Sequence, residues 1–126
     1  MYRVDIINRG ESDFTVKSKD YEFIVDTKGK GITPSDTFLA GLGTCIGIYV
    51  RKFCRASRLE LRGFRIIVEA EYNEEPPICF KVINVSLDLK GLGLDEQGKN
   101  VVLHFIEKCP IHTTLKTNPQ INFNLI

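Results

Sequence analysis

The sequence has no marked excess of charge, no long apolar run and no dense set of cysteines. Its 17 lysines and arginines balance 16 aspartates and glutamates, which argues against a dedicated binder of nucleic acid or another polyanion. The longest uncharged apolar run, Thr37 to Val50, has fourteen residues and is shorter than the roughly 20 that cross a bilayer. Four cysteines in 126 residues are too few for a small scaffold built on disulfides.

Targeting signals and nucleotide-binding motifs are absent as well. The opening residues, MYRVDIINRGESD, carry charges and no apolar stretch like that of a secretory signal. We therefore expect a cytoplasmic protein whose cysteines are reduced. The glycine motifs that cradle phosphates and the short motifs of common hydrolases do not occur. Without repeats or low-complexity stretches, the 126 residues predict a single domain, residues 1–126.

Hydrophobic periodicity predicts an α+β fold with two antiparallel β-regions and two main helices. Alternating or β-branched runs bounded by turn residues predict strands at residues 3–8, 14–18, 21–25, 64–72, 79–90 and 119–125. Helical patterns cover residues 34–57 and 95–108, with a short helix from 110 to about 116.

The first helix has a clear start signal. Thr33 suits the N-cap, Pro34 the first helical position, and Asp36 the third position of a capping box. The signal predicts a helix of some 23 residues, roughly 35 Å long.

Three glycines, Gly41, Gly43 and Gly47, interrupt this helix at a cost of about 1 kcal/mol each relative to alanine. Small residues at this density usually let another backbone, often another helix, approach closely. Apolar residues lie on more than one side of the helix, which is typical of a helix buried nearly all round. Because one subunit of this size supplies little surface to bury it, we predict that the helix is central and forms part of a dimer interface.

The four cysteines differ in position. Cys109 precedes Pro110 at a predicted N-cap, where the helix dipole and free N–H groups favour a thiolate; the alternative is an inert cap. Cys45 lies in mid-helix, where a small buried side chain is the plain alternative. Cys54 lies nine residues further, on the opposite helix face, so the two cannot form a disulfide within the helix. We predict Cys54 and Cys79 to be packing residues.

Two other kinds of site rest on weaker patterns. Cys109 and His112 form one C-x-x-H pair with His104 nearby, but structural zinc usually takes four ligands in paired spacings, so we expect no metal. Four arginines fall on one face of the predicted helix and its continuation, and the near-neutral total favours a solvated helix end over a nucleic-acid surface. These are Arg51, Arg55, Arg58 and Arg62.

Several segments together resemble a known family. GITPSDTFLAGLGTCIGIYVRKFCRA resembles the long helix of the OsmC-like family, also called the OsmC/Ohr superfamily, with its P-x-E-L-L-L-A-A-L-G-x-C pattern. Asp36 stands where the family usually has glutamate. KCPIHTTLKTNPQINFNL resembles the second signature, a Cys-Pro followed by a short helix and a closing strand, and EEPPICFKVINVSLDLKGLGLDE resembles the region between the two. The resemblance runs essentially from end to end.

This resemblance implies an intertwined homodimer whose long helices pack together, with active sites at the subunit interface. It also implies a thiol-dependent peroxidase for organic hydroperoxides, with hydrogen peroxide as a further substrate, in oxidative-stress defence. Cys45 would attack the O–O bond, become a sulfenic acid and condense with Cys109. An external thiol or dithiol would reopen the disulfide, without a cofactor.

The family's peroxidases also use an arginine and a glutamate to hold and activate the thiolate. Asp36 is the nearest match to the acid, but it lies nine residues before Cys45 on the opposite helix face, so it acts across the dimer or only caps the helix. Arg9, in an N-terminal turn, is the arginine candidate, followed by Arg3. The alternative function is a non-catalytic dimeric module that binds an apolar ligand or senses thiol oxidation at the interface pocket.

Overall fold

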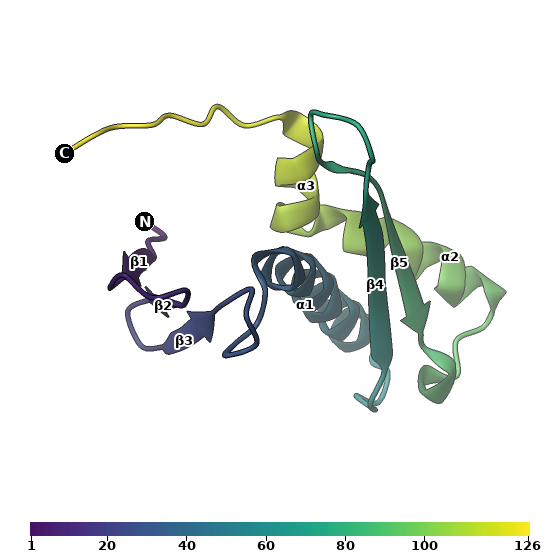
Figure 1. The fold of residues 1–126 in the computed structure, drawn as a ribbon. Helices are drawn as coiled ribbons and strands as arrows, with labels where there is room; N and C mark the ends of the chain where they lie inside the picture. Colours follow the sequence, from purple (N-terminus) through teal and green to yellow (C-terminus); the bar gives the residue numbers. More distant parts are fainter. The chain divides into compact units, whose positions relative to one another are not determined.

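The computed structural model describes residues 1–126, which form two compact units, residues 1–40 and residues 41–126. Figure 1 follows the chain from its purple N-terminus to its yellow C-terminus. A long helix, α1 (Pro34–Ala56), begins in the first unit and continues in the second. The predicted boundaries of this helix, 34 and 57, are thus confirmed to within one residue.

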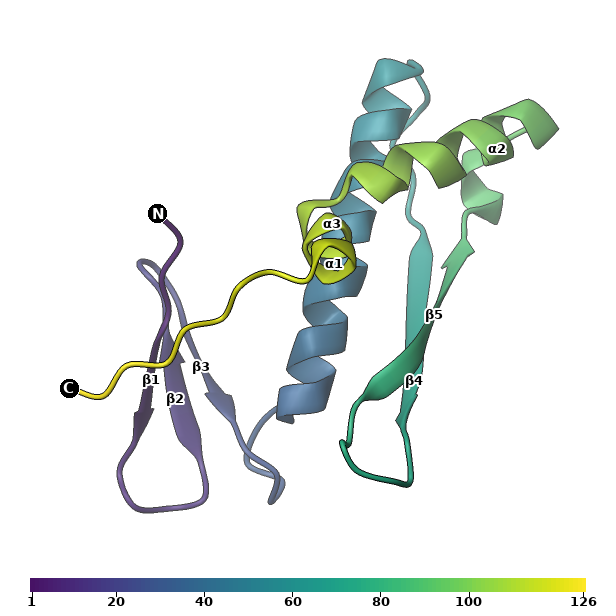
Figure 2. The same cartoon turned by 90° about the horizontal axis from the view of Figure 1, so that it is seen from above.

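The first unit contains a three-stranded antiparallel meander in the order β1 (Asp5–Asn8), β2 (Phe14–Lys17) and β3 (Glu22–Val25), as the sequence predicts. Its strands are drawn in purple and blue in Figure 2. The turn after β1 depends on Asn8, whose side-chain oxygen accepts a hydrogen bond from the N–H of Gly10 at 3.1 Å. Gly10 has a φ of 97°, a backbone conformation that favours glycine.

A buried carboxylate organises the loop that leads to α1. The side chain of Asp26 is only 2% exposed, and its Oδ2 accepts a hydrogen bond from the N–H of Lys30 at 3.1 Å. Burial raises the pKa of Asp26, but hydrogen bonds from the backbone of Lys30 and Lys28 and from the Ser12 hydroxyl outweigh it, so that the pKa lies below its usual value. The carboxylate therefore stays ionised while it holds the turn of residues 26–30 together.

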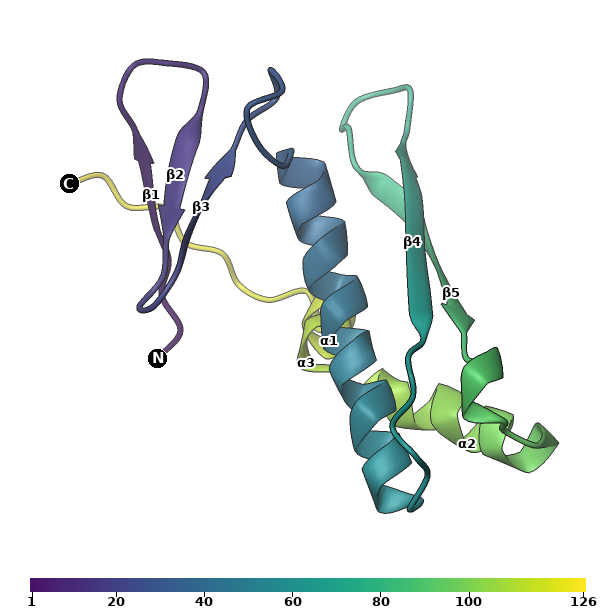
Figure 3. The same ribbon diagram turned by 90° about the horizontal axis from the view of Figure 1, so that it is seen from below.

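The second unit consists of α1, a β-hairpin and two further helices. The hairpin pairs β4 (Arg65–Tyr72) with β5 (Phe80–Asp88) in antiparallel register, and a stacked Tyr72–Phe80 pair lies next to the connecting loop, with ring centroids 4.2 Å apart. Figure 3 shows α1 alongside β4, with α2 at the C-terminal half of α1. The elements after α1 are β4 (Arg65–Tyr72), β5 (Phe80–Asp88), a 3₁₀ turn (Lys90–Leu92), α2 (Glu96–Phe105), a second 3₁₀ turn (Ile106–Lys108) and α3 (Pro110–Thr117).

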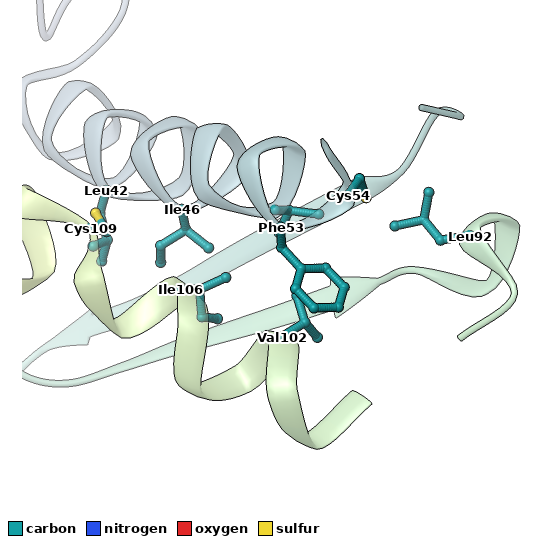
Figure 4. Packing of buried hydrophobic residues seen from close by; sticks show 9 residues of the cluster. Leu42, Ile46, Phe53, Cys54, Leu92, Val102, Ile106 and Cys109 are labelled. Atoms are coloured by element: carbon teal, nitrogen blue, oxygen red, sulfur yellow. The ribbon is translucent and has the colours of Figure 1, made fainter. Parts of the chain in front are cut away.

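The hydrophobic core of this unit lies between α1, the inner face of the hairpin and α2 (Figure 4). It explains two of the helix glycines. A Cβ on Gly43 would lie 2.9 Å from Cγ2 of Val68, and one on Gly47 would lie 3.4 Å from Cδ1 of Ile66. The element that approaches the glycines within this chain is therefore the strand β4, where we had expected another helix. Gly41, by contrast, has no other side chain or strand within reach of a Cβ.

Within the single chain, the hairpin and α2 cover only one side of α1, so that its burial on the other side by a second copy stays a prediction. Five residues at helical spacing form an exposed stripe: Gly41, Thr44, Ile48, Arg51 and Arg55. The predicted arginine face also ends early. Arg58 has a left-handed φ of 56° just past the helix, and Arg62 pairs with Glu60 at 3.0 Å.

Two further predictions differ from the structure. Residues 119–125 form no strand, because a strand needs the N–H and C=O groups of a neighbour and no strand of either sheet pairs with this segment. The apolar side chains of this segment, Ile121, Phe123 and Leu125, are at least 72% exposed. Cys79 is also exposed and is not a packing residue, because it lies in the connection between β4 and β5, where its N–H donates to Oδ1 of Asn73 and its carbonyl accepts from the N–H of Asn73. No helix of the structure has the length and apolarity to cross a membrane.

Candidate active site

The structure brings Cys45 and Cys109 together. Cys45 lies midway along α1 and is partly exposed, whereas Cys109 is fully buried at the start of α3. The Cys109 side chain hydrogen-bonds that of Cys45, and both thiols are free. Residues 64 positions apart in the sequence thus place two free thiols next to each other, as a disulfide between them would require.

Cys109 occupies the N-cap of α3, as predicted. Pro110 follows at the first helical position, and the Cys109 Sγ accepts a hydrogen bond from the N–H of His112 at 3.5 Å. The N–H of Ile111 donates to the sulfur of Cys45. The first turn of α3 therefore presents one backbone donor to each sulfur, where the helix dipole favours negative charge.

The surroundings of Cys45 nevertheless favour the thiol over the thiolate. Burial raises the pKa of Cys45 above its ordinary value, and the adjacent Cys109 raises it further. The N–H of Ile111 and the positive charge of Lys52 oppose this rise without cancelling it. Within one chain, the thiol that the resemblance assigns to peroxide attack is therefore protonated at neutral pH.

An aromatic group lies beyond the thiols, on the same side of α1. The ring centroids of Tyr49 and Phe105 are 6.2 Å apart, and those of Phe53 and Phe105 are 6.0 Å apart. Lys52 Nζ lies 4.5 Å from the centroid of Tyr49, and Lys108 Nζ lies 4.8 Å from that of Phe105. This group joins the thiols to the core, since Cys45, Tyr49 and Phe105 all pack against the buried cluster.

The other two candidates, Arg9 and Asp36, belong to the first unit, whereas both cysteines belong to the second. Arg9 follows β1, and its Nη1 donates to Oγ1 of Thr15 at 2.9 Å. Asp36 lies in the first turn of α1, where its N–H donates to Oγ1 of Thr33 at 3.1 Å. Thr33 thus caps α1 as predicted.

Sequence reasoning missed three groups at this site: Tyr49, Lys52 and the N–H of Ile111. The first two lie four and seven residues after Cys45, so helical spacing alone would have placed them on its face. The N–H of Ile111 is a backbone group and carries no side-chain signal. No group of three or more His, Cys, Asp or Glu side chains is arranged to hold a metal ion.

Two surface pockets lie elsewhere in the second unit. One, of about 790 Å³, is lined by β5 and α2 residues, including Leu87, Lys99 and Leu103. The other, of about 350 Å³, lies between the end of α1 and the start of α2, beside Leu59 and Val101. Neither includes Cys45 or Cys109, so the paired thiols form a separate site.

Known proteins resemble this chain over nearly its whole length. The model of the OsmC-like protein family matches residues 27–124. A hydroperoxide reductase of Mycoplasma genitalium is 21% identical over 98% of this chain and 93% of its own. The crystal structure of an OsmC-like protein from Mycoplasma pneumoniae has a TM-score of 0.80 at 19% identity, covering 93% of this chain and 88% of the other.

An organic hydroperoxide resistance protein of Bacillus subtilis superposes with a TM-score of 0.64 at 20% identity, covering 94% of this chain and 92% of the other. At such identities the superpositions establish the shared α+β fold, with its long helix and antiparallel sheets. The family match spans both cysteines and the helix that carries Cys45. The chain belongs to the OsmC-like protein family.

Proposed function

We propose that this protein is a thiol-dependent peroxidase that reduces organic hydroperoxides, and also hydrogen peroxide, in oxidative-stress defence. The observation that carries the proposal is the contact between Cys45 and Cys109 at the N-terminus of α3. A distant relative bears the name hydroperoxide reductase, which agrees with this chemistry. We place the activity in the cytoplasm, whose reducing environment would return both thiols to the free state seen in the structure.

The reaction balances with these two sulfurs and an external dithiol. The Cys45 thiolate attacks one peroxide oxygen, so that an S–O bond forms as the O–O bond breaks, and the leaving alkoxide takes a proton to become the alcohol. The Cys109 thiol then attacks the Cys45 sulfenic acid, forming the disulfide and releasing water. A dithiol reductant returns two electrons and two protons, which restores both thiols. Protein side chains and the reductant supply everything the cycle needs.

The raised pKa of Cys45 calls for a further positive charge at this site. We assign that role to Arg9 and propose that Asp36 orients its guanidinium, as the acid does in the peroxidases of the family. Both belong to residues 1–40, which we propose form one functional domain with residues 41–126. A guanidinium close to the sulfur would favour the thiolate and so offset the effect of burial.

We further propose that the protein acts as a homodimer. The exposed Ile48 on α1 and the exposed apolar side chains of residues 119–125 support this proposal, because one chain leaves them without cover. A second copy would supply the neighbour that residues 119–125 need to form a strand.

Peroxide consumption by the purified protein tests the proposed function. With cumene hydroperoxide and excess dithiothreitol, the wild-type protein should turn over many times. Cys45→Ser should abolish turnover, and Cys109→Ser should leave a Cys45 sulfenic acid that a dimedone probe detects. Cys79→Ser is the matched control, because Cys79 is an exposed free cysteine that takes no part in the proposed cycle. Wild-type activity in Cys45→Ser would overturn the assignment.

A second candidate, a non-catalytic sensor of thiol oxidation, is favoured by one observation, the raised pKa of Cys45. A protonated thiol reacts slowly with peroxide, which suits a single oxidation event better than repeated turnover. The sensor would form the Cys45–Cys109 disulfide once per chain and consume no further peroxide. Sustained turnover in the same assay excludes it.

A further inference from the structure

The helix α1 places three side chains in a line along one face. Tyr49 and Lys52 follow Cys45 by four and seven residues, spacings that repeat on the same side of an α-helix. Side chains on a helix lean toward its N-terminus, so that a lysine at the seventh position leans back toward the first. The observed side chain of Lys52 does so, because its Nζ lies 4.5 Å from the ring centroid of Tyr49, one turn earlier.

The ring that holds this ammonium is itself fixed. Tyr49 is partly buried and packs against Phe105, which in turn packs against Phe53 in the core. A lysine over such a ring is attracted by the negative face of the aromatic system. The positive charge of Lys52 is therefore held at one place beside α1. An unrestrained lysine side chain would instead move its charge among many positions in solvent.

Among the cations of α1, Lys52 is the one whose charge acts on Cys45, and the other elements near this thiol contribute few charged or titratable groups. α3 contributes the Cys109 thiol and His112, whose Nδ1 is 3.2 Å from the carbonyl of Glu107. The turn before α3 contributes Glu107 and Lys108, and Lys108 lies over Phe105. β4 faces the helix with the apolar Ile66 and Val68.

Arg51, one position before Lys52, acts on a different thiol. Its charge lowers the pKa of Cys54, whereas the charge of Lys52 lowers that of Cys45. The charges of two adjacent basic residues on one helix thus act on the pKa values of two different cysteines. This gives a matched control for any experiment on Lys52.

We propose that Lys52, held over the Tyr49 ring, is a positioning residue that acts through Cys45 by supplying a fixed positive charge in favour of its thiolate. The inference deepens the proposed peroxidase function and rests on it for its biological meaning. The electrostatic effect itself is a property of the reduced protein and can be measured without peroxide.

The test is the pH dependence of Cys45 alkylation. Reduced wild-type, Lys52→Met, Lys52→Arg and Arg51→Met proteins are pulsed with iodoacetamide at low ionic strength, and the label on Cys45 is quantified by mass spectrometry. Lys52→Met should raise the midpoint by about 0.3–0.5 pH unit, which lowers the thiolate fraction two- to threefold at a fixed pH below it. Lys52→Arg should restore at least half of the shift, and Arg51→Met should leave the Cys45 midpoint unchanged.

Salt gives a second measurement that needs no substitution. Raising the salt concentration from 0.05 to 1 M shortens the screening length from roughly 14 to 3 Å, so that the wild-type midpoint should move toward that of Lys52→Met. The same change in salt concentration should move the Cys45 midpoint of Lys52→Met much less. His112→Gln, measured alongside, separates any contribution of the imidazole.

A Cys45 midpoint that is the same in wild-type protein and folded Lys52→Met, or an equal shift in Arg51→Met, overturns the inference. If Lys52→Met does not fold, a wild-type midpoint that ignores salt overturns it equally. If Lys52→Met shifts the Cys45 midpoint as expected but the wild-type protein does not turn over cumene hydroperoxide, the proposed peroxidase function is contradicted and the inference about Lys52 stands. The two failures are thus distinguishable.

Discussion

Cys45 and Cys54 share one helix, yet their sulfurs meet different surroundings. Cys54 is fully buried among apolar side chains, and burial raises the pKa of its thiol above the ordinary 9.0, opposed only by the charge of Arg51. The native protein therefore keeps a proton that the unfolded chain releases above pH 9, and folding stability from this group falls as the pH rises. Below pH 9 its contribution is fully present.

The stability of wild-type protein should therefore exceed that of Cys54→Ala by a margin that is constant from pH 7 to 8.5 and narrows as the pH passes 9 and approaches the native pKa. Urea unfolding under reducing conditions at each pH measures this margin. Taking the difference from Cys54→Ala removes the contributions of lysines and tyrosines that titrate in both proteins. A margin independent of pH up to 11 would contradict the proposed burial of the protonated thiol.

At the scale of residues, local sequence signals predicted the position of Cys109 in its helix, but not the electrostatic surroundings of the cysteines. Cys109 was predicted at an N-cap because Pro110 marks the first helical position, a local signal that needs no tertiary information. The pKa of Cys45, by contrast, depends on burial and on a partner thiol 64 residues away. The exposure of Cys79 was missed for the same reason, because packing is decided by tertiary contacts.

At the scale of elements, Gly43 is where the helix and the hairpin come closest. A Cβ there would lie 2.9 Å from Cγ2 of Val68, a stiff β-branched side chain that cannot easily move aside. Gly43→Ala should therefore lower the free energy of unfolding by about 0.5–2 kcal/mol, because the overpacking cost exceeds the roughly 1 kcal/mol gained in helix propensity.

Denaturant unfolding of four proteins checks this prediction. They are the wild type, Gly43→Ala, Val68→Ala and the double variant. Because Val68→Ala removes the obstructing methyl groups, Gly43→Ala should cost less, or even stabilise, in that background. Strictly additive effects would mean that the two residues do not meet.

The boundaries of the elements were largely predictable, since caps and turn residues are local. Thr33 and Pro34 set the start of α1, and the Pro76–Pro77 region separates β4 from β5. The conformation of segment 119–125 was not predictable, because its alternating pattern predicts a strand but does not identify the strand that would pair with it. Gly43 and Gly47, but not Gly41, mark a close approach as predicted, and the identity of the approaching element needed the tertiary structure.

At the scale of the whole molecule, the proposed dimer makes a prediction about the end of the chain. Phe123 is 92% exposed, and a strand formed with a second copy would cover it together with Ile121 and Leu125. Phe123→Asp should therefore shift the protein toward monomer at micromolar concentration, as measured by sedimentation velocity. Asn122→Asp introduces the same charge on the opposite face of the segment and should have a much smaller effect. A wild-type protein that sediments as a monomer throughout would end the dimer proposal.

The Cys109 sulfur has one more consequence. It caps the N-terminus of α3 by accepting a hydrogen bond from the N–H of His112. In the proposed cycle, the same sulfur would lose its proton and bond to the sulfur of Cys45. A single atom is thus shared between a structural bond and a redox bond. The backbone amide of His112 consequently serves as a built-in reporter, whose NMR resonance follows the bonding state of that sulfur without any added label.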